Sequence, residues 1–278
     1  MKNVASRFRL FYAIAILLLI GSSSGCKSPI SEDAPEIPPK ETFLMDLSFD
    51  TSAKVAAYYG GYEPNVTILT ASNYNFAAGN VFVWNAVITV GLAVPVAAFV
   101  ESFHHAPIYK DGEWVWSYNV RVGEVYTAEL HGKIEDQKVK WAMYISKDGG
   151  YQDFNWFTGE SDIAGTEGTW TLNNKPEEPT PLLGILWHRD KTNNIGDITY
   201  TNIVSGGPEE GGYISYATTL DTPYDAYYDI YNKGKDDLIN IEWNRTTIAG
   251  RVKNLAHFGD VDWHYWDSSQ QDTIAPAQ

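Results

Sequence analysis

The chain has 278 residues, one cysteine, and 35 acidic side chains against 20 basic ones, which gives a formal net charge of −15. A surface of that charge repels nucleic acid and anionic lipid head groups, which argues against both as direct partners. The single cysteine leaves no intramolecular disulfide, so burial of apolar surface alone must stabilise the fold.

The first 26 residues have the features of a targeting segment. Three basic residues precede the apolar run LFYAIAILLLI (residues 10–20), and a short Gly/Ser run leads to Cys26. Ser23-Ser24-Gly25-Cys26 resembles the lipobox of bacterial lipoproteins, although Ser23 stands where that family more often has an aliphatic residue. The resemblance implies a signal peptide over residues 1–25 and a diacylglycerol anchor with palmitate-type chains on Cys26. An ordinary secretory signal is the alternative.

Residues 26–41 are rich in proline and charge, which predicts a disordered tether before a domain that starts at residue 42. In lipoprotein families an Asp after the cysteine tends to retain the protein at the inner membrane. Lys27 therefore implies transport to the outer membrane. The sequence does not decide between its periplasmic face and its surface face. Ser31-Glu32-Asp33 resembles the export signals of outer-membrane and surface lipoproteins in Bacteroidota. After removal of residues 1–25 the chain would contain 17 basic and 35 acidic residues, which gives a net charge of −18.

The run VFVWNAVITVGLAVPVAAFV (residues 81–100) has the length of a membrane span, for which about 20 apolar residues are enough. However, no Lys or Arg lies between Lys54 and Lys110, so the basic flank that orients a spanning helix is missing. We therefore expect a buried helical segment over about 76–105, broken between Gly91 and Pro95. A helix that is apolar on nearly all faces must be surrounded, so the rest of the fold is expected to enclose it.

Twelve strand-like runs follow, over about 114–266. They are residues 114–122, 124–134, 139–146, 151–159, 168–174, 182–189, 195–204, 211–220, 225–233, 237–244, 250–258 and 260–266. Apolar Trp141, Met143 and Ile145 alternate with other residues, as expected for strands with one buried face. The connections are short turns, which implies sequential antiparallel neighbours and excludes helical crossovers.

These runs predict one mainly β domain over residues 42–268, followed by a disordered tail over 269–278. We expect a large antiparallel up-and-down meander, closed or curled into a barrel, with the helical segment packed inside or against it. A two-sheet sandwich is the second choice. A barrel that spans the membrane is less favoured, because a lipid anchor would be redundant on it.

The densest polar cluster is HFGDVDWHYWD (residues 257–267). On a strand, Asp260, Asp262 and His264 would share one face, about 7 Å between successive members. Two carboxylates and an imidazole can bind a divalent cation. The alternative, which we favour, is the solvent-exposed face of a terminal strand.

The chain contains no nucleophile elbow, phosphate loop or zinc-protease helix motif. The sequence therefore identifies no catalytic residue and no cofactor, and it favours a non-enzymatic protein that is held at the membrane through Cys26. A structural or accessory role in the cell envelope is the first expectation. The second is a binder of an apolar or aromatic ligand in the barrel mouth, lined by Trp84 and Phe99. The third is a glycan-binding or glycan-cleaving surface protein, with Trp156 or Trp266 exposed beside two carboxylates.

Overall fold

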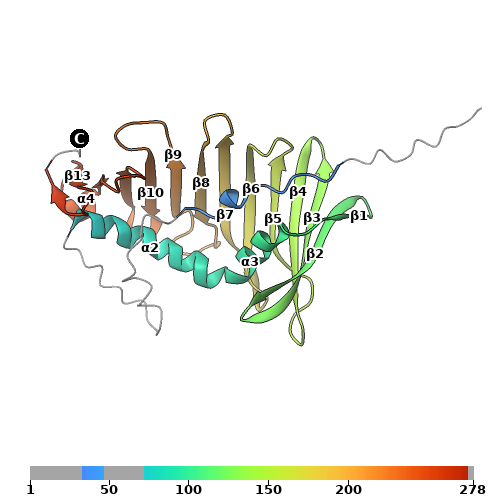
Figure 1. The fold of residues 1–278 in the computed structure, drawn as a ribbon. Coiled ribbons are helices and arrows are strands. Elements are labelled where there is room, and N and C mark those ends of the chain that lie inside the picture. The colour runs from blue at the N-terminus through green and yellow to red at the C-terminus, as the bar shows by residue number, and fades with distance from the viewer. Residues whose placement is uncertain (1–32, 47–71, 275–278) are drawn as a thin grey trace, which may run out of the picture. The chain divides into compact units, whose positions relative to one another are not determined.

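The described part of the chain forms a single antiparallel sheet of 14 strands, which lie side by side in their order in the sequence (Figure 1). The computed structural model describes residues 33–46 and 72–274. The predicted signal peptide, the predicted lipidation site Cys26 and most of the predicted tether lie outside these residues. The compact unit that contains the sheet begins at Ala34, earlier than the predicted start at residue 42. The predicted disordered tail over 269–278 is wrong at its start, because Asp272–Thr273 pairs with the preceding strand.

The strands confirm the predicted mainly β meander and add a short strand at each end. They are β1 (Ile108–Lys110), β2 (Glu113–Val122), β3 (Glu124–Glu135), β4 (Lys138–Lys147), β5 (Phe154–Asp162), β6 (Glu167–Lys175), β7 (Glu178–Asp190), β8 (Ile195–Asn202), β9 (Tyr213–Thr218), β10 (Ala226–Asn232), β11 (Asp237–Trp243), β12 (Gly250–Lys253), β13 (His264–Trp266) and β14 (Asp272–Thr273). Tight turns join many of them. Between β3 and β4, Asp136 and Gln137 have φ values of 52° and 63°, as in the two-residue turn whose twist matches that of antiparallel strands.

The sheet does not close into a barrel. Within the described residues β1 pairs only with β2 and β14 only with β13, so the two terminal strands are edges. The curled, unclosed form of the predicted meander is therefore the one observed. Closure would require the two edge strands to meet in register, which short-range strand patterns do not specify.

Two helices cover one face of the sheet, which we call the inner face (Figure 1). They are α2 (Asn73–Gly91) and α3 (Ala93–Ser102), and Leu92 separates them, as predicted for a broken segment. α3 contacts β2, β3 and β4, and α2 contacts β10, β12 and β13. The predicted enclosure on all sides is wrong, because the open sheet covers the helices from one side and leaves Val83 49% exposed. Among the described helices, none combines the length and apolarity of a membrane-spanning segment.

Four fully buried tryptophans each lie directly across from a glycine of a neighbouring strand. The pairs are Trp141 with Gly132, Trp170 with Gly159, Trp187 with Gly168, and Trp266 with Gly250. A Cβ atom on these glycines would come within 2.1–2.8 Å of the facing indole ring. The glycines therefore create the space in which large rings lie against the backbone of the sheet.

Residues 34–46, which we call the N-terminal strap, also lie on the inner face. Phe43 stacks on Phe99 of α3, with ring centroids 4.6 Å apart, and the Trp170 ring lies 5.8 Å from Phe43. The Tyr200 hydroxyl donates to the carbonyl oxygen of Phe43 (2.9 Å) and accepts from the backbone N–H of Met45 (2.6 Å). Because this strap is hydrogen-bonded to buried side chains, it belongs to the fold and not to the tether.

Candidate functional site

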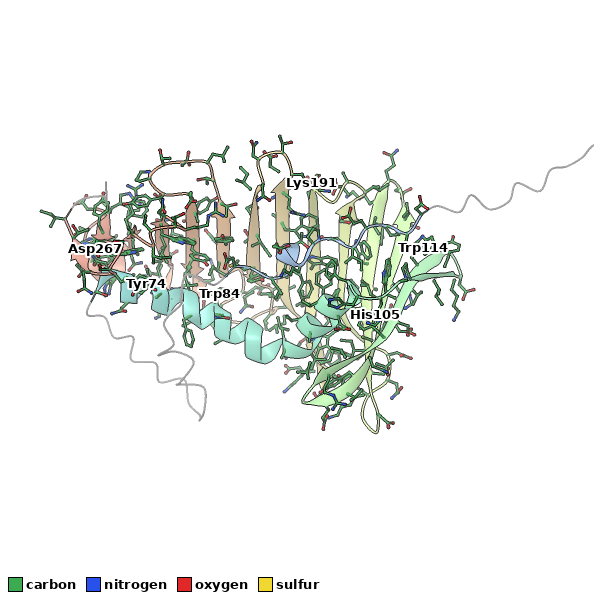
Figure 2. The ribbon with its side chains drawn as sticks, viewed as in Figure 1. Tyr74, Trp84, His105, Trp114, Lys191 and Asp267 are labelled. Atoms are coloured by element: carbon green, nitrogen blue, oxygen red, sulfur yellow. The ribbon has the colours of Figure 1, made fainter. Side chains whose placement is uncertain are left out.

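The predicted ligand-binding residues pack in the core. Trp84, on α2 (Figure 2), is partly buried against the core cluster, Phe99 has no exposed surface, and Trp156 is 6% exposed. Trp266, the other tryptophan considered for a glycan cleft, is also fully buried. None of the hollows described below is lined by these four side chains. Their aromatic surface therefore stabilises the fold.

The predicted metal-binding residues do not share a strand face. Gly259, with φ of 80°, ends the short helix α4 (Leu255–Phe258), so the predicted strand over 250–258 is wrong in its second half, because the Asn254 side chain caps a helix there. β13 begins only at His264, so the predicted strand over 260–266 is wrong in its first half. His264 Nε2 lies 3.0 Å from Asp260 Oδ1, and that oxygen also accepts from the backbone N–H of Asp262 at 3.0 Å. The turn thus brings His264 and Asp260 together, and Asp262 contributes its backbone. In the described residues, no three His, Cys, Asp or Glu side chains are grouped so that they could hold a metal ion.

The candidate functional site is a hollow of about 490 Å³ on the outer face, opposite the helices. This volume lies within the range of small-molecule sites. We call it the Arg251 hollow, and its lining residues are Thr219, Asp221, Thr222, Pro223, Tyr224, Ala226, Tyr227, Glu242 and Arg251. The loop between β9 and β10 supplies residues 219–224. Tyr227, Glu242 and Arg251 come from β10, β11 and β12, where they are direct cross-strand neighbours.

Arg251 is held in one orientation by an ion pair and two aromatic rings. Its Nε and Nη2 atoms donate to Glu242 Oε2 at 2.9 and 2.6 Å. Its guanidinium carbon lies 5.0 Å from the Tyr224 ring centroid and 4.2 Å from that of Trp263, both within cation–π range. Since Glu242 already neutralises the guanidinium, Arg251 offers little free positive charge, and its contact with the Tyr224 ring fixes that side chain in the hollow.

Tyr224 carries the unusual feature of the hollow. Its side chain is 7% exposed, and its buried hydroxyl has no hydrogen-bond partner among the described residues. Burial is the main reason that the pKa of this hydroxyl is raised, so the group stays protonated and can donate as well as accept. Leaving a buried polar group without a partner costs about 1–3 kcal/mol. Tyr224 lines the hollow, so its hydroxyl is a polar group there whose hydrogen-bonding capacity the described residues leave unused.

Two smaller hollows have no cation–π pair among their lining residues. One, of about 230 Å³, lies between the N-terminal strap and the ends of β7, β8 and β9, and it includes Arg245 and Trp187, whose Nε1 is also buried without a partner among the described residues. The Arg245 side chain in it is paired with Asp225 at 3.2 Å. The other, of about 190 Å³, lies over β4 to β7, where Lys138 of β4 is paired with Glu160 of β5. Neither combines a cation–π pair with an aromatic hydroxyl.

Sequence reasoning did not find the Arg251 hollow. Alternation along β11 placed Glu242 on a polar face, but nothing in the local pattern identifies Arg251, nine positions later, as its partner. The pairing depends on the turn between β11 and β12, where the Asn244 side chain accepts from the backbone N–H groups of Thr246 and Thr247. The sequence pattern assigns residues 219 and 220 to the predicted strand over 211–220 and leaves only residues 221–224 as the connection to the next strand.

Comparisons of this chain with protein-family models, with curated proteins and with solved structures find no match.

Proposed function

We propose that this protein is a non-enzymatic lipoprotein of the outer membrane, anchored through Cys26, that binds a ligand in the Arg251 hollow. The anchor rests on the lipobox-like Ser23-Ser24-Gly25-Cys26 and on Lys27 after it. Two or three acyl chains give stable membrane attachment, which a single chain does not. The protein would act as an accessory component of the envelope by recognition of a ligand.

The observation that carries the binding role is the contrast between the inner face and the hollow. On the inner face, Phe43 and Phe99 are 1% and 0% exposed and stack on each other, which leaves them no surface for an apolar ligand. In the hollow, the Tyr224 hydroxyl is buried and has no partner in the part of the chain that the structure describes. Buried polar groups are nearly always hydrogen-bonded in native proteins, so this hydroxyl supports a bound molecule as its partner.

Fractionation of cells that express the natural chain and the Cys26→Ser variant tests the anchor. We expect the natural chain in the outer-membrane fraction, extracted only by detergent, and the variant in the soluble envelope fraction. Release of the natural chain by salt alone would contradict lipid anchoring.

Native mass spectrometry of protein purified from its own host tests the binding role. We expect an added mass on the natural chain that is lost or reduced in Tyr224→Phe. The matched control is Tyr151→Phe, since the Tyr151 hydroxyl is also buried without a partner among the described residues but does not line the hollow. An added mass that both variants retain equally would place the ligand elsewhere.

A further inference from the structure

We propose that the Arg251 hollow binds a neutral sugar ring, as part of an uncharged glycan. This inference rests on the proposed binding function and names its ligand class. It follows from three properties of the hollow: its mixture of ring faces and polar groups, the free hydrogen-bonding capacity of Tyr224, and its charge.

The lining offers apolar surface and hydrogen-bonding groups next to each other. Pro223 is exposed and Tyr227 half-buried, and both offer apolar surface, while Thr219 and Thr222 carry hydroxyl groups and Asp221 a carboxylate. A pyranose ring has the matching construction, with a C–H face and hydroxyl groups at its edge that both donate and accept. Aromatic side chains with a polar end suit such ligands, because the ring packs while the hydroxyl bonds. A purely apolar ligand would cover the Asp221 carboxylate without offering it a hydrogen bond.

Tyr224 and Asp221 supply hydrogen bonds that the protein itself does not use. The Tyr224 hydroxyl lacks a partner among the described residues. The backbone N–H of Asp221 donates to Thr219 Oγ1 at 3.1 Å, which holds the loop, and the side chain of Asp221 is exposed. Carboxylates are strong acceptors for ligand hydroxyls, since charge-assisted hydrogen bonds are about twice as strong as neutral ones.

Charge distinguishes a neutral glycan from an acidic one. Two carboxylates, Asp221 and Glu242, and one guanidinium, Arg251, line the hollow, so its formal charge is −1. The whole chain carries a net charge of −15. Both charges repel uronic acids, phosphates and sulfates. The neutral ligand class is the one that this environment does not penalise.

An array of neutral, amino and acidic oligosaccharides, probed with the detergent-extracted full-length lipoprotein, tests the inference, and calorimetry on the best ligand measures its affinity. We expect binding to neutral oligosaccharides that changes little when the ionic strength is raised about tenfold. Tyr224→Phe should weaken that binding by about 2- to 12-fold, the value of one ordinary hydrogen bond. Asp221→Asn, an exposed change that preserves shape, should weaken it as well, whereas Tyr151→Phe should leave it unchanged.

Binding to acidic glycans alone, or a neutral-glycan affinity that Tyr224→Phe and Asp221→Asn leave unchanged, would overturn the inference. The proposed function fails separately. A non-sugar ligand that native mass spectrometry finds on the natural chain, but not on Tyr224→Phe, would refute the proposed sugar ligand and support the binding role of the Arg251 hollow. If neither the array nor native mass spectrometry detects a ligand that depends on Tyr224, both proposals are wrong.

Discussion

Replacement of Gly159 by alanine tests whether the tryptophan–glycine pairs stabilise the sheet. An alanine Cβ at this position would lie 2.1 Å from Trp170 Cε3, and 2.6 Å from both Trp170 Cζ3 and the carbonyl oxygen of Thr169. Real Cβ atoms do not approach other atoms so closely, so the indole ring and a backbone segment must both move. Overpacking of a core costs about 1–3 kcal/mol. We expect Gly159→Ala to lower the free energy of unfolding by about 3 kcal/mol, since one of the three contacts is with backbone.

Gly184→Ala is the matched control, because Gly184 is also a strand glycine of the same sheet. Its alanine Cβ would lie 3.4 Å from Ile203 Cγ2, which is ordinary van der Waals contact. There the replacement should stabilise the protein by up to about 1 kcal/mol, since alanine restricts the unfolded chain more than glycine does. Urea unfolding followed by tryptophan fluorescence measures both variants, with the midpoint shifted and the slope m unchanged.

A double-mutant cycle assigns the cost to the ring. In a Trp170→Leu background both indole contacts of Gly159→Ala disappear, while the contact with Thr169 remains. Gly159→Ala should then cost clearly less than in the natural chain, which gives a coupling energy outside additivity error. Equal destabilisation by Gly159→Ala and Gly184→Ala, or a coupling energy near zero, would refute the reasoning.

Two further predictions concern the strap and the C-terminal turn. Tyr200→Phe leaves the Phe43 carbonyl and the Met45 N–H without their partner. It should lower the free energy of unfolding, measured in urea, by about 1–3 kcal/mol for each group. A change below about 0.5 kcal/mol would contradict a structural role of the strap. Burial, and next the neighbouring His264, lowers the pKa of His257 below its ordinary value of 6.5, so folding favours the neutral imidazole. The contribution of His257 to the free energy of unfolding is therefore complete above pH 6.5 and is lost as the pH falls toward the pKa of the folded state. An NMR titration should give a His257 pKa below 6.5 that rises in His264→Asn, and a value at or above 6.5 in the natural chain would contradict the prediction.

The order and pairing of the strands could be predicted from local chemistry alone. Trp141, Met143 and Ile145 occupy every second position of β4 and are 0–2% exposed, as alternation predicts for a half-buried strand. Short turns leave each strand no route except back along its neighbour, so an up-and-down order follows without knowledge of the tertiary structure. The break near Gly91 was equally local, because glycine and proline interrupt helices through their own backbone properties.

The strap shows where composition misled. Proline and charge over residues 26–41 predicted a tether, yet the compact unit begins at Ala34. Ile37 is 9% exposed, and Thr42 and Phe43 are each 1% exposed. The segment forms almost no hydrogen bonds within itself apart from one short turn at Lys40–Thr42. Its order depends on Trp170, which donates to the Thr42 carbonyl at 3.1 Å, and on Tyr200. These partners lie more than a hundred residues away, beyond the reach of any local pattern.

By itself, the sequence determined the alternating strands and a broken apolar helix, and it predicts lipidation at Cys26. The tertiary structure alone decided that the sheet stays open, that Phe99 and Trp156 fill the core, and that Arg251, Glu242 and Tyr224 meet around a hollow. The physical reason is the range of the forces involved. Alternation, turns and helix breaks depend on neighbours along the chain. Strand closure, ion-pair register and an unpartnered hydroxyl depend on surfaces that meet only after folding.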